Sequence, residues 1–373
     1  MKAVRLADVC SISAGLVDPR LPRFHNLLHV GGANIESDTG ALRDLLTAKS
    51  EGLTSGKFFF DKTAVLYSKI RPYLKKVATP DFDGLCSADI YPLSPREAID
   101  RRYLFYLLLS DNFTRYAIQG SARAGMPKVN RDHLFAYEFE LPKLTEQRRI
   151  VRILDEAFAA IATARANTEK NLQNACELFE SQITLIFESR DQNWDVTTLD
   201  RLATNLDSRR VPITKNARSA GPYPYYGASG IVDYVADYIF DEESLLVSED
   251  GANLLMRSSP IAFSATGKYW VNNHAHVLSF REKATQRFVE FYLESIPIDD
   301  FVTGAAQPKL NQKALNSIPI PIPRSIELRS AIVERIESIS TETASLESLY
   351  AQKLTALDAL KQSLLHHAFT GQL

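Results

Sequence analysis

Basic side chains gather in short segments of this sequence, with a spacing suited to contacting phosphates. Residues 68–76 read Ser-Lys-Ile-Arg-Pro-Tyr-Leu-Lys-Lys and place four cations beside one tyrosine. Lysine and arginine neutralise phosphates, and arginine on a loop can also hydrogen-bond base edges. We therefore predict nucleic-acid contacts from Lys69, Arg71, Lys75 and Lys76. A run of this kind is equally typical of an ordinary solvated surface.

A second set of candidates surrounds a Pro-Lys-x-Asn segment that occurs twice, at residues 127–130 and 308–311. Cations in and around these copies suit phosphates, and an asparagine amide suits an adenine edge. The candidate residues in the two copies are Arg123, Lys128, Arg131, Lys309 and Asn311. Both copies are therefore predicted to lie against nucleic acid.

The two halves of the sequence differ beside this motif. Where the first half carries Lys69-Ile70-Arg71, the second half carries Glu249-Asp250-Gly251. The cationic role cannot be transferred directly to acidic residues, so we expect Arg257, Lys268 and Lys309 to replace it.

Two aromatic segments of the second half can either stack on bases or pack in a core. Residues 221–230 form a turn-rich loop of Gly, Pro and Tyr, for which a packed corner is the favoured interpretation. Lys268-Tyr269-Trp270 fits both interpretations equally. Tyr269 is therefore kept as a candidate for DNA contact.

Motifs for catalysis are missing from the sequence. Gly120 to Gly125 has the glycine spacing of a phosphate-binding loop, but Met126-Pro127 stands where Lys and Ser or Thr are required. Neither an Asn-Pro-Pro-aromatic methyltransferase motif nor a glycine-rich AdoMet loop is present, and no Ser-His-Asp arrangement has a recognisable context. We expect no catalytic residues and no cofactor bound by this chain.

His274 and His276 alternate along a predicted strand and so point to one face. A metal site needs a third ligand, and the sequence gives no sign of one. A structural, hydrogen-bonded pair is the favoured interpretation, ahead of DNA contact and well ahead of metal binding. We therefore predict no metal site.

Composition gives only broad limits. The 373 residues are 45% apolar, and 43 Lys and Arg against 45 Asp and Glu leave a net charge of -2, so any basic surface must be local. Cys10, Cys86 and Cys176 are widely separated and suggest neither a disulfide framework nor a zinc site. With no signal peptide or membrane-spanning segment recognised, we expect a cytoplasmic protein without a membrane partner.

An internal repeat positions these candidates. Residues 308–311 follow residues 127–130 by 181, and the offset becomes 182 along the helical stretches that come after each copy. The heptad positions predicted for the second stretch are Ile332, Ile336, Ile339, Thr343, Leu346, Tyr350, Lys353, Leu357, Leu360 and Leu364. Those of the first are Ile150, Leu154, Ala157, Ile161, Ala164, Thr168, Asn171, Ala175, Leu178 and Gln182. These tracks predict two long helices packed antiparallel on each other rather than in separate cores.

Short strands and helices between the repeats predict an α+β chain of four parts. We expect α/β domains at residues 1–143 and 190–324, with long helices at 144–189 and 325–373. Two domains at opposite ends of the helix pair would be related by a pseudo-twofold axis. Among the matching landmarks, Leu245 to Ser248 answers Val65 to Ser68, and Ala275 to Leu278 answers Ala88 to Tyr91.

The whole chain resembles the specificity (S) subunit of type I restriction-modification systems. The segments that carry the resemblance are residues 29–40, 65–74, 146–151, 223–231 and 368–373. The resemblance implies a non-catalytic bipartite DNA reader, in which two target-recognition domains read an interrupted, asymmetric site and the paired helices set the gap.

The resemblance also implies partners. The helices would dock two modification subunits that carry AdoMet and methylate adenine, and motor-nuclease subunits using ATP and Mg would join them. Candidate docking residues on the helices are Arg148, Arg149 and Arg329. The alternative is a non-catalytic scaffold whose two adaptor domains bind proteins.

Overall fold

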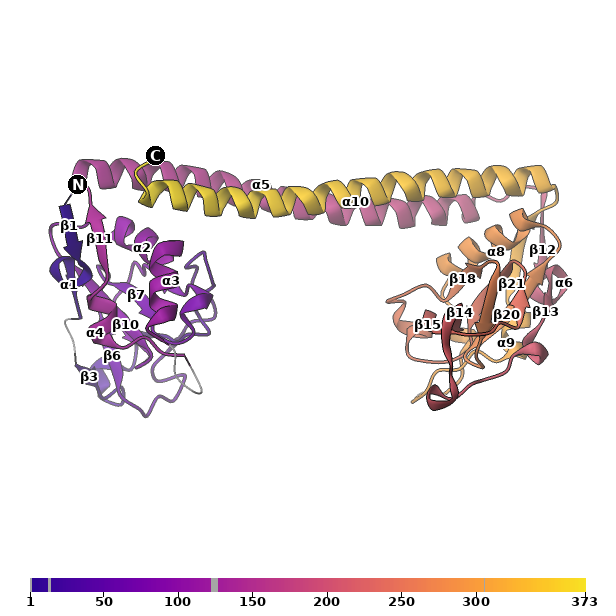
Figure 1. Ribbon diagram of the computed structural model, residues 1–373, viewed down its shortest axis with the longest axis horizontal. Coiled ribbons are helices and arrows are strands. Elements are labelled where there is room, and N and C mark those ends of the chain that lie inside the picture. The colour runs from indigo at the N-terminus through magenta and orange to yellow at the C-terminus, as the bar shows by residue number, and fades with distance from the viewer. Residues whose placement is uncertain (1, 13–14, 122–126, 305) are drawn as a thin grey trace. The chain divides into compact units, whose positions relative to one another are not determined.

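The computed structural model describes residues 2–12, 15–121, 127–304 and 306–373. The chain divides into two compact units, one of residues 1–169 with 352–373 and one of residues 170–351. Each unit contains an α/β body and part of both long helices, α5 (Leu144–Glu188) and α10 (Ile326–Phe369) (Figure 1).

The body of unit 1 contains three antiparallel or mixed sheets. The paired strands β1 (Lys2–Arg5) and β11 (Glu138–Leu141) lead into α5. The second sheet has the order β2 (Cys10–Ser11), β10 (Ile90–Pro95), β7 (Val65–Ser68), β8 (Val77–Ala78). The third has the order β3 (Leu16–Val17), β6 (Lys57–Phe60), β9 (Gly84–Cys86), β4 (Leu28–Val30), β5 (Leu46–Thr47). The helices and 3-10 turns are α1 (Leu6–Val9), α2 (Arg101–Leu109), α3 (Asp111–Gln119), α4 (Arg131–Phe135), η1 (Pro22–Phe24) and η2 (Pro72–Leu74).

Unit 2 repeats this plan with different loops. Strand β12 (Trp194–Thr198) pairs with β21 (Pro319–Pro323), in which every second residue is proline. The next sheet has the order β13 (Ala203–Asn205), β20 (Ala275–Phe280), β17 (Ser244–Ser248), β18 (Ala262–Ala265), and the last has β15 (Gly230–Val235), β14 (Ala220–Gly227), β19 (Lys268–Val271), β16 (Phe240–Asp241). The helices and turns are α6 (Leu199–Leu202), α7 (Asn253–Met256), α8 (Lys283–Ser295), α9 (Gln312–Ser317), η3 (Asp207–Arg209), η4 (Lys215–Ala217) and η5 (Asp299–Phe301).

Strand register confirms one predicted landmark of the repeat and corrects another. Ser68 of β7 pairs with Ile90 of β10, and Ser248 of β17 pairs with Ala275 of β20. Leu245 to Ser248 therefore does answer Val65 to Ser68. Ala275, however, corresponds to Ile90 and not to Ala88. The prediction was wrong by two residues because a two-residue shift leaves the alternation of side chains between the two faces of the strand unchanged.

The aromatic loop predicted at residues 221–230 is mostly a strand. Residues 220–227 form β14, which pairs with β15 through a tight connection and a bulge. Tyr225 is buried in β14, and its hydroxyl accepts a hydrogen bond from Ile213 N at 3.0 Å. Core packing is thus the role of this ring.

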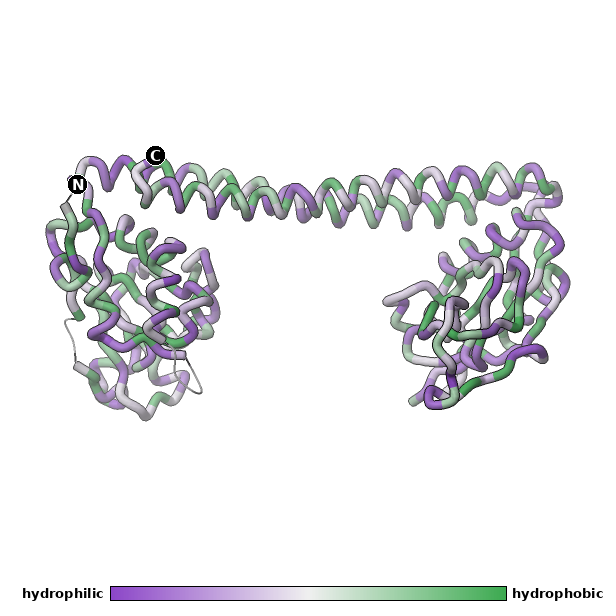
Figure 2. Tube along the Cα trace, viewed as in Figure 1, coloured by the Kyte–Doolittle hydropathy of each residue, from purple (hydrophilic) through white to green (hydrophobic). Residues whose placement is uncertain are grey.

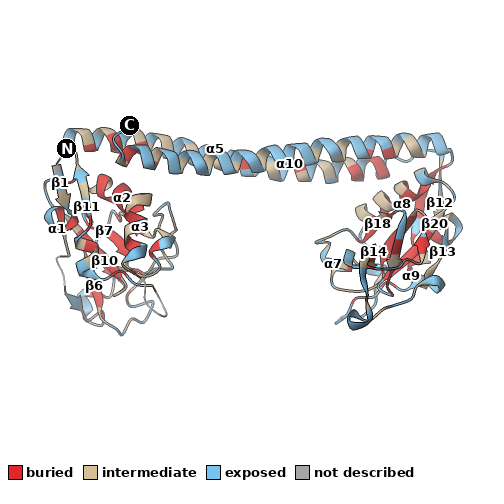
Figure 3. Ribbon diagram, in the orientation of Figure 1, coloured by how far each residue is buried: buried red, intermediate tan, exposed pale blue. Residues whose placement is uncertain are grey.

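Each unit has its own apolar core, seen as the buried segments of Figure 3. In unit 1 the helix α2 is apolar all round and buried from Tyr103 to Leu109, and Asp100 caps it by accepting from the N–H groups of Arg102 and Tyr103. Ile150 and Leu154 of α5 join this core. The helix pair is thereby fixed to the body by burial of apolar surface.

The long helices pack antiparallel, as predicted. In unit 1, Arg149 donates to Leu373 O and Arg165 to Asp358 at 2.6 Å, so the partner number falls as the α5 number rises. Apolar and polar turns alternate along both helices (Figure 2).

The predicted heptad track is right at some positions and wrong at others. On the track, Leu154, Ala175 and Ile336 are buried, whereas Leu178, Leu346 and Leu360 are 59%, 40% and 48% exposed. A helix of 3.6 residues per turn drifts away from a strict seven-residue repeat, which moves the contact face by one residue. Lys353 and Asn171 are exposed for the same reason.

Candidate nucleic-acid interface

The segment that follows β7 in unit 1 pairs with the first Pro-Lys-x-Asn copy. Arg71 N donates to Pro127 O at 2.9 Å, and Val129 N donates to Lys69 O at 2.8 Å. Ile70 and Lys128 form an isolated antiparallel bridge between these bonds. We call residues 69–71 with 127–129 bridge 1.

The segment that follows β17 in unit 2 makes the same bonds. Gly251 N donates to Pro308 O at 3.0 Å, and Leu310 N donates to Glu249 O at 2.8 Å. Asp250 and Lys309 form the isolated bridge here. We call residues 249–251 with 308–310 bridge 2.

The asparagine of each Pro-Lys-x-Asn copy is a helix cap. The side chain of Asn130 accepts from His133 N at 2.7 Å, and that of Asn311 accepts from Ala314 N at 3.0 Å. A side-chain oxygen at this position satisfies one of the free N–H groups of a helix start. The motif is therefore explained by the local fold, and Asn311 is removed from the base-reading candidates.

Bridge 1 carries cations around a single carboxylate. Asp89 Oδ1 lies 3.2 Å from Lys128 Nζ and 3.6 Å from Lys69 Nζ, and the Lys69 ammonium also donates to Ala88 O. Burial, followed by repulsion from Lys128, lowers the pKa of Lys69. Two lysines share one counter-ion, so a net positive charge remains on this surface.

Arg71 stands out on bridge 1. It is exposed, and among the described residues its side chain has no hydrogen-bond or ion-pair partner. Its φ of 48° is in the left-handed region, which costs a non-glycine residue about 1 to 2 kcal/mol. The corresponding residue of bridge 2 is Gly251, with φ 108°. Strained backbone of this kind is common at functional sites, so Arg71 stays a predicted phosphate contact.

The other basic candidates of unit 1 divide into anchored and exposed residues. Lys75 is anchored by Asp111 at 2.7 Å, and Lys76 donates to Gly32 O, so both support the fold. Arg131 is exposed at the start of α4, with its guanidinium 5.9 Å from the Tyr91 ring centroid. Arg123 lies outside the described residues.

Bridge 2 carries the opposite charge, supplied by Glu249. Arg210 Nη1 donates to Glu249 Oε2 at 2.8 Å, and Lys309 Nζ lies 3.2 Å from Glu249 Oε1. The Arg210 guanidinium also lies 3.3 Å from Asp207 Oδ2. Lys309 itself remains half exposed, so it can still reach a phosphate.

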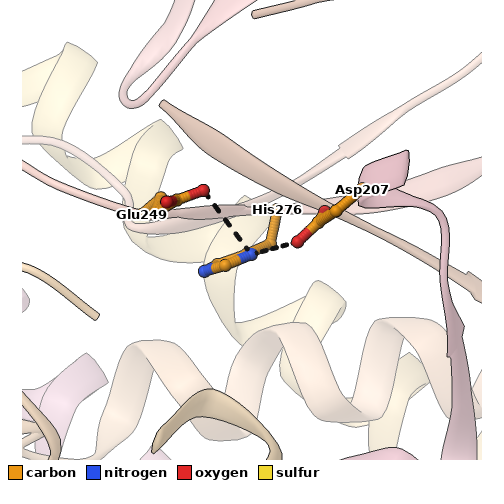
Figure 4. A group of neighbouring side chains, drawn as sticks. All are labelled: Asp207, Glu249 and His276. Atoms are coloured by element: carbon orange, nitrogen blue, oxygen red, sulfur yellow. Dashed lines mark hydrogen bonds and ion pairs between the residues drawn. The ribbon is translucent and has the colours of Figure 1, made fainter. Parts of the chain in front are cut away.

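Asp207, Glu249 and His276 converge (Figure 4). Arg210 pairs with both carboxylates of this group. His276 Nδ1 is 2.6 Å from Asp207 Oδ2, and its Nε2 is 2.8 Å from Leu310 O. Burial alone would raise the pKa of both carboxyl groups, but hydrogen bonds from His276 to Asp207 and from Arg210 to Glu249 lower them. The cluster is a folded charge network that ties β20, β17 and bridge 2 together.

This cluster contains the ligand types of a metal site, with one atom from each of the three residues within 4.8 Å of the others. These two carboxylates could not be recognised from sequence as neighbours of His276, because Asp207 is distant in the chain and Glu249 depends on the β17 to β20 register. Arg210 already pairs with both carboxylates, and His276 uses both ring nitrogens. We therefore assign the cluster to structure, as the sequence interpretation of His276 favoured. His274 is likewise held, 2.9 Å from Asp250.

Three further candidates lie in unit 2. Tyr269 is fully buried and stacks on Phe240 at 5.3 Å, so its predicted DNA contact is corrected to a core role. Arg257 is anchored by the carbonyl oxygens of Leu293 and Ile296. Lys268 is exposed, with its ammonium 4.6 Å from the Tyr238 ring centroid.

Most of the docking candidates on the helices already form hydrogen bonds or ion pairs within their own units. Arg149 binds Glu146 and Leu373 O, and Arg329 binds Pro323 O at 2.8 Å together with Glu282. Arg148 is exposed, 3.9 Å from Asp100. Exposed apolar side chains of the long helices were not predicted from the sequence as docking residues. In unit 2 they include Leu178, Leu185, Leu346 and Leu349.

Comparison with known proteins gives one consistent family. The model of the family described as Type I restriction modification DNA specificity domain matches residues 1–173 and 191–356. Among curated proteins, the specificity subunit of the type I restriction enzyme EcoDI from Escherichia coli is 35% identical over 184 residues, which are 49% of this chain and 40% of that protein. A putative type I specificity subunit from Haemophilus influenzae is 35% identical over 159 residues, 43% of this chain and 40% of that protein. The matched stretches thus span about 40% of the length of these relatives.

Solved structures share the fold along the whole chain. A chain from a study of complex assembly and conformational transition of the type I restriction-modification system has a TM-score of 0.82, with 20% identity and coverage of 100% of this chain and 98% of that one. The HsdS subunit from Thermoanaerobacter tengcongensis has a TM-score of 0.68, with 20% identity and coverage of 100% and 97%. In the described part of the chain, no helix combines the length and hydropathy that a bilayer span requires.

Proposed function

The chain belongs to the family of type I restriction-modification DNA specificity proteins, and from this membership we propose that it is a non-catalytic subunit that reads a bipartite, asymmetric DNA site. Each unit would read one half-site. We propose residues 1–143 and 190–324 as the two recognition domains, and residues 144–189 and 325–373 as the helices that set the gap.

The observation that carries this proposal is the pair of bridges. Bridge 1 and bridge 2 share their backbone hydrogen bonds but hold cations in one unit and Glu249 with Asp250 in the other. A protein that reads two unlike half-sites needs the same backbone arrangement in both units with different side chains on it. The side-chain contacts to bases determine which sequence is bound, while the backbone positions those side chains.

The phosphate contacts would come from side chains that stay exposed. In unit 1 these are Arg71, Lys128 and Arg131, and in unit 2 they are Lys268 and Lys309. Lys69, Lys75, Lys76 and Arg257 would act indirectly, by holding the loops that carry the exposed cations. Few contacts per unit and a net charge of -2 predict modest affinity for the isolated chain.

Partner subunits would supply the chemistry and further phosphate contacts. The exposed leucines of α5 and α10 in unit 2 are suited to packing against helices of a modification subunit. In unit 1 the exposed Arg148 is a separate docking candidate. AdoMet, ATP and Mg would be bound by modification and motor-nuclease subunits, with no cofactor on this chain.

Methylation sequencing tests the proposal. A plasmid host expresses this chain with its cognate modification subunit, and the control host expresses the modification subunit alone. We expect N6-methyladenine in a motif of two short defined parts separated by a fixed unspecified gap, only when this chain is present. Random or absent methylation by a demonstrably assembled complex would contradict the proposal.

A further inference from the structure

Each bridge is followed by a short helical turn that ends at a basic residue with positive φ. After bridge 1 come the turn η2 (Pro72–Leu74) and then Lys75, with φ 46°. After bridge 2 come the turn α7 (Asn253–Met256) and then Arg257, with φ 51°. In both units a cation in the left-handed region ends the turn, although the sequences of the turns are unrelated.

The terminal cations fix the turns to their own units. The Lys75 side chain is only 11% exposed and is bound by Asp111. Arg257 donates to Ile296 O at 2.6 Å and to Leu293 O at 3.2 Å. A strained backbone residue persists only where its surroundings hold it, so each turn is a rigid feature of its unit.

Large apolar side chains project from these rigid turns into solvent. Tyr73 is 53% exposed, and in unit 2 Leu255 and Met256 are 46% and 72% exposed. One neighbour in each turn, Pro72 or Leu254, is buried and anchors it. The exposed tips are therefore held out by the fold itself.

Each turn follows in the chain a bridge that carries an exposed cation. Tyr73 follows Arg71, whose strand pairs with the segment of Lys128, and Met256 follows Gly251, whose strand pairs with the segment of Lys309. Cations that contact phosphates would bring an adjacent apolar tip against the groove. In the major groove the apolar group on a base edge is the C5 methyl of thymine.

We propose that the two turns are specificity-determining tips, and that Tyr73 in one half-site and Met256 with Leu255 in the other each pack against a thymine methyl group. This proposal rests on the proposed function. It assigns base discrimination to residues other than the charged ones, and it places one such contact in each unit.

Tyr73→Ala and Met256→Ala test the proposal in the methylation assay described above. We expect Tyr73→Ala to relax one A·T position in one half-site, and Met256→Ala to relax one A·T position in the other. Val196→Ala is the matched control, since Val196 of β12 is 68% exposed in unit 2 but lies outside the turn and bridge. This control should leave the motif unchanged.

A binding measurement on the assembled complex sharpens the result. Replacing the thymine at the relaxed position by deoxyuridine removes only the methyl group and should weaken wild-type binding about tenfold, while the matching alanine variant should not respond to the replacement. Circular dichroism melting of each variant verifies that it is folded. Unchanged motifs, relaxation at a G·C pair, or equal uridine effects on wild type and variant would overturn this inference while the wild-type motif still supports the proposed function. Absence of a wild-type motif would instead contradict the proposed function itself.

Discussion

The bridges of the two units have the same backbone and opposite electrostatics. At bridge 1 a single carboxylate, Asp89, pairs with Lys69 and Lys128, and Arg71 has a positive φ and no side-chain partner among the described residues. Bridge 2 has Gly251 at that position, and the charge network of Asp207, Glu249 and Arg210 supports it. The difference shows that the same backbone arrangement can carry an arginine without a partner in one unit and a carboxylate paired with basic residues in the other.

The largest expected effect comes from removing the cation of the bridge 2 network. Arg210→Ala should lower the free energy of unfolding of unit 2 by about 3 kcal/mol, because two poorly exposed carboxylates lose their counter-ion. Arg209→Ala is the matched neighbour, since Arg209 makes a surface pair with Glu242, and it should cost less than about 1 kcal/mol. Urea unfolding of both variants measures this; equal losses would contradict the comparison.

Acid should destabilise unit 2 before unit 1. The pKa values of Asp207 and Glu249 are lowered from 3.8 and 4.5, so their network stabilises the fold fully above those ordinary values and stops doing so as pH falls through the lowered folded values. We expect unit 2 to lose protection in hydrogen exchange before unit 1 as the pH falls below the ordinary carboxyl values of 4.5 and 3.8. In the Asp207→Asn, Glu249→Gln variant this acid loss should shrink. Earlier loss of unit 1 would show that the network does not govern acid stability.

A smaller effect is expected from the backbone of bridge 2. Gly251→Ala should cost about 1 to 2 kcal/mol through strain at φ 108° alone, since nothing lies within 4 Å of the added carbon. Gly32→Ala, which is equally open but lacks a positive φ, should be close to neutral. Thermal unfolding distinguishes the two, and a neutral Gly251→Ala would mean that bridge 2 can relax.

The smallest expected effect is on how strongly DNA binding depends on salt concentration. If the proposed function holds, Arg71→Ala should reduce the slope of log affinity against log salt by about 1 in the assembled complex. Lys309→Ala should reduce this slope less, because the ion pair with Glu249 already neutralises part of the Lys309 charge. A reversed order, measured by binding titrations at several salt concentrations, would argue that bridge 2 carries the stronger phosphate contact.

The sequence predicted the repeat, the long antiparallel helices and both Pro-Lys-x-Asn segments because each leaves a local periodic signal. It could not predict the network around His276, since Asp207 and Arg210 reach it through the pairing of β13 with β20 and Glu249 reaches it through the pairing of β17 with β20. Tyr269 was ambiguous because a Lys-Tyr-Trp run looks alike on a surface and in a sheet. The heptad positions Leu178, Leu346 and Leu360 are exposed because a helix drifts away from a strict seven-residue repeat.

Strand β21 has a consequence for association. Its residues Pro319, Pro321 and Pro323 have no N–H group, and β12 is its only partner in a two-stranded sheet of the described chain. Every second position on this strand therefore lacks the donor that an incoming strand needs. Unit 2 is protected along this edge from pairing with other chains, which suits a protein that must present its surfaces to chosen partners without aggregating.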